Sequence, residues 1–142
     1  QAFDTLQDYE KEVVKKLLEF DVDIVVLAGY MRLVGSTFLK TFPNRIVNIH
    51  PALLPAFKGL NAQRQALEYG VKYTGCTVHI VDEGMDTGPI IMQSIVPVYL
   101  DDDEDILTKR ILQEEHQIYW RVLQLLAEGR VYISGRKTII KE

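Results

Sequence analysis

The stretch Arg45-Ile46-Val47-Asn48-Ile49-His50-Pro51 combines an apolar run with two polar side chains at its end. The run from Arg45 to Ile49 is rich in β-branched residues and predicts a buried strand. Successive side chains of a strand point to opposite faces, so Asn48 and His50, two residues apart, point to the same side. The stretch therefore predicts an internal strand of a sheet with a polar site at its carboxyl end.

Upstream of this strand, the sequence predicts a helix, a strand and a short helix. Apolar residues recur at helical spacing from Thr5 to Phe20. The run Ile24 to Ala28 is apolar throughout, which is typical of a parallel strand buried on both faces, and Gly29 ends it. We expect Ser36 to Thr41 to form one short helix that the Ser36 hydroxyl caps.

Downstream, the sequence predicts a second short helix and a β-hairpin. Asn61 to Tyr69 has helical periodicity, and Gly70 suits its carboxyl-terminal cap. Thr74 to Val81 and Ile90 to Val98 are rich in β-forming residues and flank the turn Asp82 to Pro89. These two runs are expected to pair as a hairpin with a long connection.

The last part of the chain predicts a long helix and a terminal strand pair. The helix extends from about Glu104 to Glu128, and the acidic residues 101–105 complement the partial positive charge of its start. Gly129 closes the helix, and Val131 to Ile133 and Thr138 to Ile140 predict the two strands.

This order of elements predicts a three-layer α/β fold with a mostly parallel sheet and an antiparallel edge. Functional sites in such sheets lie beyond the carboxyl ends of the strands. Asn48, His50 and the turn of residues 29–32 all fall at such ends. We therefore expect the site at this edge of the sheet.

Composition limits the classes of protein that the chain can belong to. With 142 residues, 47% of them hydrophobic, it suits a single domain over residues 1–142. The formal net charge of −4 argues against a nucleic-acid-binding surface. Cys76 is the only cysteine, which fits a reducing cytoplasm. No apolar stretch has the length of a bilayer span, so we expect no membrane partner.

Three polar side chains suit acyl transfer if the fold brings them together. The Asn48 amide can donate hydrogen bonds to a carbonyl oxygen that becomes an oxyanion. His50 can transfer a proton near neutral pH, and Asp86, from the glycine-bounded turn, would favour its charged form. Each residue alone also fits a structural role, with Asn48 and Asp86 as turn residues and His50 as a buried, hydrogen-bonded side chain.

Other chemistries fit the sequence less well. His79 lies on the same predicted strand face as Thr77 and is expected to pack in the core or behind the site. No histidine or further carboxylate stands at a ligand-like spacing from Asp82 and Glu83, so we expect no metal. Cys76 lies within a predicted strand and no nucleophile elbow is present, which favours direct transfer between bound substrates over covalent catalysis.

The motifs around these residues resemble those of phosphoribosylglycinamide formyltransferases, the folate-dependent enzymes of purine biosynthesis. Residues 48–60 (NIHPALLPAFKGL), 75–79 (GCTVH) and 82–89 (DEGMDTGP) carry the resemblance, which extends over nearly the whole chain. It implies a formyltransferase-type, Rossmann-like fold. It also implies transfer of a formyl group from 10-formyltetrahydrofolate to the amine of glycinamide ribonucleotide, by direct attack through a tetrahedral intermediate.

The resemblance also implies roles for individual residues. Asn48 and protonated His50 would stabilise the oxygen of the intermediate, while Asp86 would hold His50 and a water that shuttles the proton. No metal takes part, and a homodimer is left open. The implied folate-binding residues are Met31, Arg32, Leu33, Val34, Asn48, Asp82, Glu83, Gly84, Met85 and Asp86. The implied ribonucleotide-binding residues are Leu112, Gln113, Glu114 and Glu115, with Glu115 orienting the amine.

Two features depart from the family pattern. The family begins with a strand and a glycine-containing loop that grips the substrate phosphate, and this sequence has no counterpart. We therefore expect an N-terminally truncated fragment of the formyltransferase domain, whose activity by itself is an open question. Leu6 stands where the family carries a basic residue near the folate, so this contact is not expected here.

Three alternatives to the purine enzyme stay open. Formyltetrahydrofolate deformylase would use the same three groups with water as the acceptor, but Pro51 and residues 59–64 favour the purine enzyme. Methionyl-tRNA formyltransferase is disfavoured by the net acidity. A non-catalytic folate-binding module of a larger polypeptide would keep the pocket without needing His50.

Overall fold

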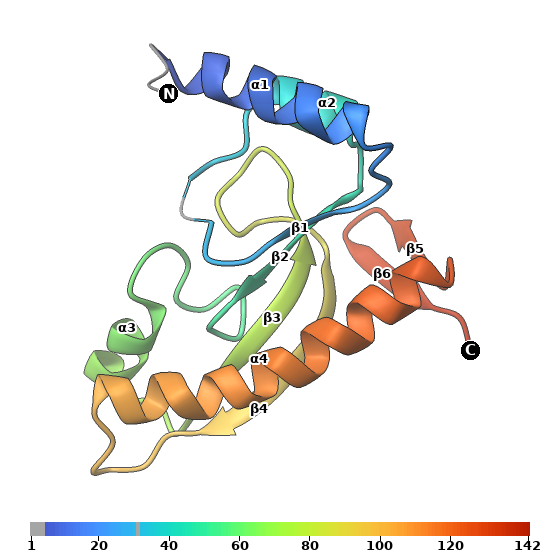
Figure 1. Cartoon of the computed structure of the whole chain (residues 1–142). Coiled ribbons are helices and arrows are strands. Elements are labelled where there is room, and N and C mark those ends of the chain that lie inside the picture. Colours follow the sequence, from blue (N-terminus) through green and yellow to red (C-terminus); the bar gives the residue numbers. More distant parts are fainter. Residues whose placement is uncertain (1–4, 31) are drawn as a thin grey trace.

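Helices lie on both sides of a mixed sheet in the computed structural model, which describes residues 5–30 and 32–142 (Figure 1). The strands follow the order β1 (Val25–Leu27), β2 (Ile46–His50), β3 (Tyr73–Ile80) and β4 (Ile90–Pro97). β1 pairs with β2 in parallel, whereas β2–β3 and β3–β4 are antiparallel. The α/β fold class is confirmed, and antiparallel pairing extends inward to β2 instead of being confined to the edge.

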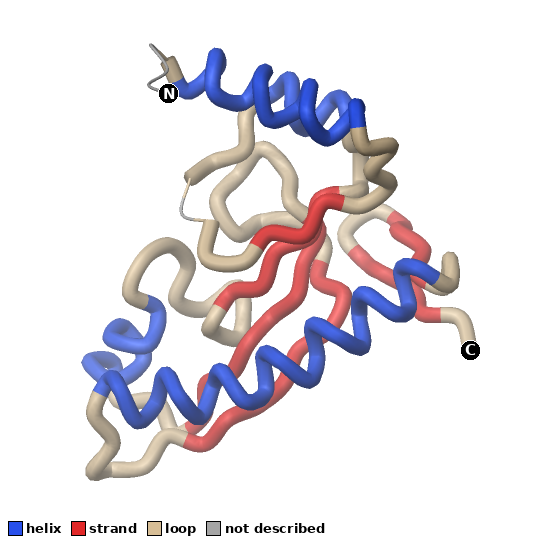
Figure 2. Tube along the Cα trace, in the orientation of Figure 1, coloured by secondary structure: helices blue, strands red, loops and turns tan. Residues whose placement is uncertain are grey.

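The two faces of β2 belong to two different hydrophobic cores. Ile46 packs with residues of α1 (Leu6–Glu19) and α2 (Ser36–Thr41). Val47 packs with residues of α4 (Glu104–Ala127), which crosses the strands in Figure 2. Both side chains are fully buried. Since alternate residues of a strand share a face, Asn48 and His50 follow Ile46 onto the face opposite α4.

The helix predicted for Thr5 to Phe20 is confirmed as α1, and Thr5 caps it by accepting a hydrogen bond from the Asp8 N–H. The predicted cap of α2 is wrong. Gly35 occupies the cap position and Ser36 is already helical, so no side chain caps this helix. The Gly35 N–H instead donates to the carboxylate of Glu10 in α1, at 2.9 Å, which ties the two helices together.

The strand predicted for Ile24 to Ala28 is shorter and more exposed than the sequence indicates. Val25 is buried, but Val26 is 44% exposed. The reason is its place in the sheet, because β1 lies at the end of the strand order among the described residues and only β2 pairs with it there. The apolar composition of this run therefore did not predict which of its faces is covered.

The remaining elements agree with the sequence predictions. Helix α3 (Ala62–Tyr69) ends at Gly70, which has a φ of +82° and thus the left-handed conformation that glycine adopts without strain. The hairpin of β3 and β4 forms as expected. The Asp103 carboxylate caps α4 by accepting from the Ile106 N–H. β5 (Val131–Ser134) and β6 (Lys137–Ile140) pair in a separate two-stranded sheet.

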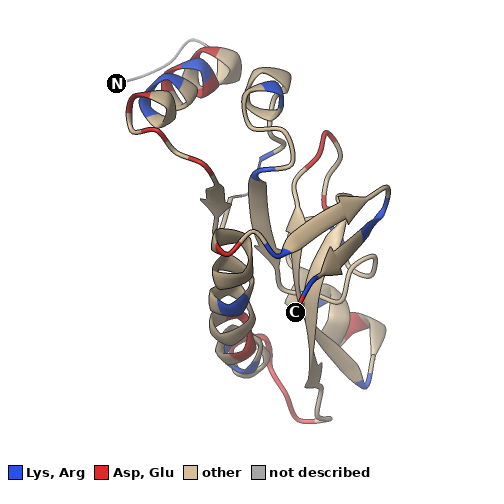
Figure 3. Ribbon diagram, turned by 90° about the vertical axis from the view of Figure 1, so that its right-hand side faces the viewer, with Lys and Arg blue, Asp and Glu red and all other residues tan. Residues whose placement is uncertain are grey.

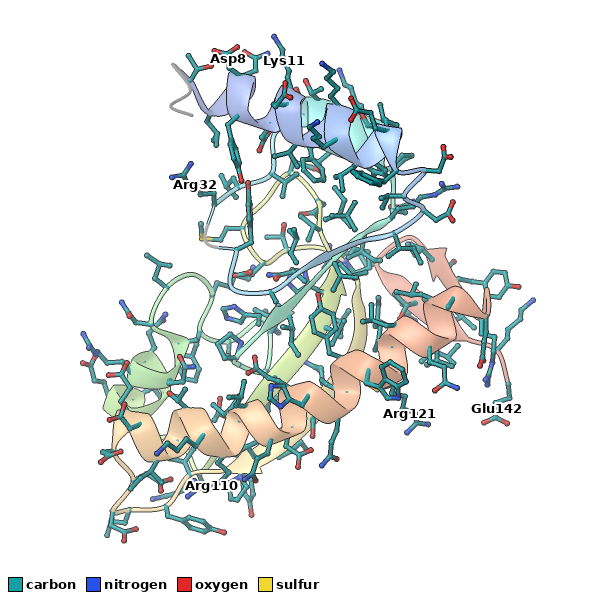
Figure 4. All side chains as sticks on the ribbon, viewed as in Figure 1. Asp8, Lys11, Arg32, Arg110, Arg121 and Glu142 are labelled. Atoms are coloured by element: carbon teal, nitrogen blue, oxygen red, sulfur yellow. The ribbon has the colours of Figure 1, made fainter. Side chains whose placement is uncertain are left out.

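The start of α4 is fixed to the end of β4 by Arg110, labelled in Figure 4. Its guanidinium donates to both carboxylate oxygens of Asp102 and to the Pro97 carbonyl. It also lies 4.5 Å from the centre of the Tyr99 ring. These contacts set the point at which α4 begins to cross the sheet, and therefore which of its residues reach the site.

In Figure 3 the ribbons of α1 and α4 each carry segments coloured for Lys or Arg and for Asp or Glu. Within residues 5–30 and 32–142, no helix combines the length and the apolar character that a membrane span requires.

The packing of α4 on the sheet predicts a large difference between two isoleucines of the same helix. Ile111 is completely buried, whereas Ile106 is 47% exposed. Replacing Ile111 by Ala should lower the free energy of unfolding by about 2–5 kcal/mol, because it leaves a cavity against β3 and β4. Ile106→Ala is the matched control and should change it by less than about 1 kcal/mol. Urea unfolding measures the free energy of unfolding of both variants, and equal losses would contradict the burial of Ile111 against the sheet.

Candidate active site

A cavity of about 430 Å³ opens beyond the carboxyl ends of β1 and β2. One wall comes from the segment after β1, another from the loop between β2 and α3, a third from the turn between β3 and β4, and the last from α4. This is the edge of the sheet at which the sequence predicts a site. The described residues that line the cavity are 27–30, 32–34, 48–51, 59–63, 79, 81, 84–86, 112, 115, 116 and 119.

His50 is buried at the end of β2, with an oxygen atom facing each of its ring nitrogens. Nε2 lies 2.8 Å from the Phe57 carbonyl oxygen, which can only accept, so this nitrogen carries a proton. Nδ1 lies 3.5 Å from the Asp86 carboxylate. A neutral imidazole can donate to only one of these acceptors, whereas the imidazolium has an acceptor for each N–H. Each ring nitrogen of His50 therefore faces an oxygen that can accept a hydrogen bond.

The Asp86 carboxylate is held in place by the loop that precedes α3. Its Oδ2 accepts a hydrogen bond of 2.8 Å from the Gly59 N–H. The Asp86 backbone has a φ of +56°, and Phe57, whose carbonyl accepts from His50, has a φ of +52°. Positive φ is uncommon for such residues and costs free energy, so the surrounding contacts must maintain it. The loops that carry Phe57 and Asp86 thus both adopt uncommon backbone conformations where they contact the His50 ring.

Gly88 allows this turn to pack closely on β3. A Cβ atom at this position would lie 1.6 Å from the Ile80 carbonyl oxygen, closer than any side chain could be accommodated. The Asp82 carboxylate stabilises the turn from within, because it accepts from the Gly84 N–H and the Thr87 hydroxyl. Asp82 therefore shapes the turn that presents Asp86 to the cavity.

His79 approaches the other oxygen of the same carboxylate. Its Nε2 lies 3.8 Å from Asp86 Oδ1, while Nδ1 lies 3.1 Å from the Ile80 carbonyl and must donate to it. Burial lowers the pKa of His79, an effect that outweighs the opposing influence of Ile80 and Asp86. His79 is therefore neutral at pH 7. His79 was expected in the core or behind the site, but it lines the cavity.

Asn48 presents a polar group that the described protein atoms leave unsatisfied. Its Oδ1 is buried and has no hydrogen-bond partner among residues 5–30 and 32–142. A buried polar atom without a partner costs roughly 1–3 kcal/mol. Such a cost is typical of a group that binds something else, and Asn48 lines the cavity beside His50. Asn48, His50 and Asp86 line one cavity, as the sequence analysis expects of residues that act together.

One face of α4 supplies the fourth wall. Leu112, Glu115, His116 and Tyr119 follow the spacing i, i+3, i+4, i+7 and all line the cavity. Burial raises the pKa of Glu115 above its usual value, and nearby His116 opposes this. Of the four predicted ribonucleotide-binding residues, Leu112 and Glu115 therefore reach the cavity.

The other two predicted ribonucleotide-binding residues point elsewhere. Gln113 is exposed and does not line the cavity. Glu114 accepts a hydrogen bond of 2.7 Å from the Ser94 hydroxyl, which fixes it against β4. Helical periodicity gives the reason, since four consecutive residues cannot share one helix face.

The predicted folate-binding residues divide in a similar way. Arg32, Leu33, Val34, Gly84 and Met85 line the cavity. Asp82 turns into its own loop and Glu83 is exposed, so neither lines it. Met31 lies outside the described residues. In Figure 4 the Arg32 side chain lies on the outer side of its loop, away from the sheet.

Several cavity residues were not singled out from the sequence. Tyr30 and Tyr119 contribute aromatic side chains, and Asn61 and Gln63 contribute amides from the start of α3. His116 also lines the cavity. The spacing of Leu112, Glu115 and Tyr119 was the available signal, because residues on one helix face share an environment.

The described residues contain no group of three or more histidine, cysteine or carboxylate side chains arranged to hold a metal ion. Cys76 is buried in β3, and burial raises the pKa of its thiol to about 12, so it is protonated at neutral pH. It does not line the cavity.

The fold and the site together define an α/β protein with an amide, an imidazole and a carboxylate gathered in one cavity, a set of groups suited to acyl transfer. Residues 1–123 match the protein-family model described as formyl transferase. The chain belongs to the formyl transferase family.

Similar proteins include bacterial and animal members of this family. The chain is 42% identical over 130 residues to phosphoribosylglycinamide formyltransferase of Escherichia coli (strain K12), covering 92% of this chain. It is 48% identical over 132 residues, 93% of this chain, to trifunctional purine biosynthetic protein adenosine-3 of Drosophila melanogaster. The crystal structure of glycinamide ribonucleotide transformylase 1 from Symbiobacterium toebii matches 99% of the chain with a TM-score of 0.97 and 53% identity.

The chain spans only part of each of these proteins. It covers 61% of the Escherichia coli relative, 10% of the Drosophila melanogaster relative and 66% of the Symbiobacterium toebii chain.

The raised pKa of Glu115 predicts a pH-dependent stability effect. Because the pKa of Glu115 is higher in the folded than in the unfolded protein, its protonated carboxyl stabilises the fold. This stabilisation is fully present below the unfolded-state pKa, near 4.5, and is lost as the pH rises through the folded-state pKa. The ionised carboxylate therefore costs stability at pH 7. Glu115→Gln should be more stable to urea than the unmodified protein at pH 7, with a difference that shrinks toward pH 4.

The exposed Glu83 is the matched control, and Glu83→Gln should leave the free energy of unfolding unchanged at both pH values. A stability gain for Glu115→Gln that is equally large at pH 4 would show that the ionisation of Glu115 is not its cause.

Proposed function

We propose that this chain forms the catalytic part of a phosphoribosylglycinamide formyltransferase, which transfers the formyl group of 10-formyltetrahydrofolate to the amine of glycinamide ribonucleotide. The observation that carries the proposal is the convergence of Asn48, His50 and Asp86 in one cavity of a formyl transferase fold. The names of the similar proteins support the choice of substrates. Residues 1–142 would belong to one catalytic domain.

The cavity suits the folate cosubstrate, which would supply the formyl group. Its walls are largely apolar near Leu27, Ile49 and Val81, as a flat heterocycle requires, and polar groups gather at one end. Leu33, Val34 and Met85 would hold the ring system. Direct transfer needs no metal and no covalent bond to the protein, which fits the protonated, buried state of Cys76.

Asn48 and His50 would act on the formyl oxygen. The Asn48 amide would donate a hydrogen bond to it as negative charge develops, without any change in its own charge. The His50 imidazolium would stabilise the same charge. Its Nε2–H is donated to the Phe57 carbonyl in this structure, so a direct bond from Nε2 to the formyl oxygen requires the ring to exchange that acceptor.

Asp86 and Glu115 would place the reacting groups. Asp86 holds the Nδ1 side of His50, and its second oxygen, near the neutral His79, is free to accept the proton that the amine loses or a water that carries it. Glu115, on the opposite wall, would orient the attacking amine of the ribonucleotide. The two substrates would thus meet in the cavity that Asn48, His50 and Asp86 share with Glu115.

The roles of Asn48 and His50 predict large losses of activity. In the full-length protein, Asn48→Ala and His50→Ala should each lower kcat for formyl transfer by roughly a hundredfold or more. Gln117, exposed on α4 and outside the cavity, provides the control, and Gln117→Ala should leave kcat unchanged. Thermal unfolding of each variant verifies that it is folded. If His50→Ala kept full turnover, the chain would be a folate-binding module in which His50 has no catalytic role.

The identity of the acceptor is tested by the products. Incubation with 10-formyltetrahydrofolate should give the formylated ribonucleotide only when glycinamide ribonucleotide is present. Release of formate at the same rate with and without the amine would replace the proposal by a deformylase, in which water is the acceptor.

A further inference from the structure

The Tyr119 hydroxyl joins two walls of the cavity. It lies 2.5 Å from the Leu27 carbonyl oxygen at the end of β1 and 3.1 Å from the Val47 carbonyl oxygen in β2. Carbonyl oxygens only accept, so the single hydroxyl proton serves both strands, and the shorter distance makes Leu27 its main acceptor. Burial raises the pKa of Tyr119, so the hydroxyl keeps its proton at all physiological pH values.

These two carbonyls lie next to residues that line the cavity. The Leu27 carbonyl shares a peptide group with the nitrogen of Ala28, which begins the cavity wall after β1. The Val47 carbonyl shares a peptide group with the nitrogen of Asn48. Leu27 and Asn48 are register partners in the parallel pair of β1 and β2. Tyr119 therefore contacts the backbone directly before Ala28 and Asn48, which both line the cavity.

The same helix face that carries Tyr119 also carries Glu115, one turn earlier. A contact between Tyr119 and the strand ends therefore fixes the position of Glu115 relative to Asn48 across the cavity. Core packing of Ile111 and Ile118, on either side of Glu115, holds the helix on the sheet. The hydrogen bonds of Tyr119 add a polar contact between this part of the helix and the ends of β1 and β2.

We propose that Tyr119 is a positioning residue of the formyl transfer reaction, which holds Glu115 on α4 at a fixed distance from Asn48 on β2. This inference rests on the proposed function. Alignment of two bound substrates contributes strongly to the rate, and small displacements of the groups that hold them are costly. The residue touches no reacting atom in this role, so it acts through Glu115.

Tyr119→Phe is the sharpest test, because it removes only the hydroxyl and retains the ring. In the full-length protein this change should lower kcat on the order of tenfold or more. The affinity for 10-formyltetrahydrofolate, measured by calorimetry without the amine, should change by less than about twofold, because the side chains proposed to hold the ring system, Leu33, Val34 and Met85, are not on α4. Tyr132→Phe, a change of the same type on β5 outside the cavity, should alter neither quantity.

A second measurement separates positioning from a general loss of structure. If Tyr119 acts through Glu115, then Tyr119→Phe should have little further effect on kcat in a Glu115→Gln background, whereas independent effects would multiply. A multiplied loss, or an unchanged kcat in the single variant, would overturn the proposal. A loss of kcat that only follows the fraction of unfolded protein in thermal melts would do so as well.

A third measurement does not depend on activity. In a ¹H–¹⁵N NMR spectrum, Tyr119→Phe should shift the backbone amide signals of Ala28 and Asn48, and Tyr132→Phe should not. Unshifted signals would contradict the contact itself. Failure of the unmodified protein to transfer formyl groups would instead contradict the proposed function, so the two failures are distinguishable.

Discussion

The site depends on the Asp86 carboxylate, which lies nearly buried between two histidines and one backbone amide. Its side chain is only 12% exposed. A carboxylate in such a place must have hydrogen-bond and charge partners to offset the loss of water. The Gly59 N–H and the His50 ring provide them, and the surrounding turn and loop adopt uncommon backbone conformations to do so. Removing either partner would leave the carboxylate with less to offset its loss of water.

This constraint gives the two neighbouring histidines different properties. Both lie on the face of the sheet opposite α4, and register pairs Asn48 with His79 across β2 and β3. His50 has an acceptor oxygen at each ring nitrogen, whereas burial lowers the pKa of His79. One carboxylate therefore lies beside two imidazoles in different environments. A division of roles between two titratable groups set by their environments is a general feature of acid–base sites.

Helix α4 serves both the core and the cavity. Ile111, Ile118 and Val122 pack in the core, while the neighbouring face at Leu112, Glu115 and Tyr119 lines the cavity. Because one rigid helix carries both sets, packing at the sheet also positions the groups at the site. The cost of this arrangement is that Glu115 is partly desolvated, which opposes its ionised form. Retaining a carboxylate where a neutral residue would be more stable is typical of a functional position.

The amino-acid sequence by itself determined the helices, the hairpin and the polar residues at the end of β2. Local rules are sufficient for these, since the alternation of a strand places Asn48 and His50 on one side and an apolar spacing marks the helices. The tertiary structure alone decided that Val26 is exposed and that Gly35, at the cap position of α2, donates its N–H to Glu10. It also decided that Asp82 turns into its own loop while Asp86 faces the cavity. Only the tertiary structure brought Asp86 to His50 and Tyr119 to Leu27. The physical reason is that these contacts join residues distant along the chain, and their partners are set by the packing of whole elements, which no local pattern encodes.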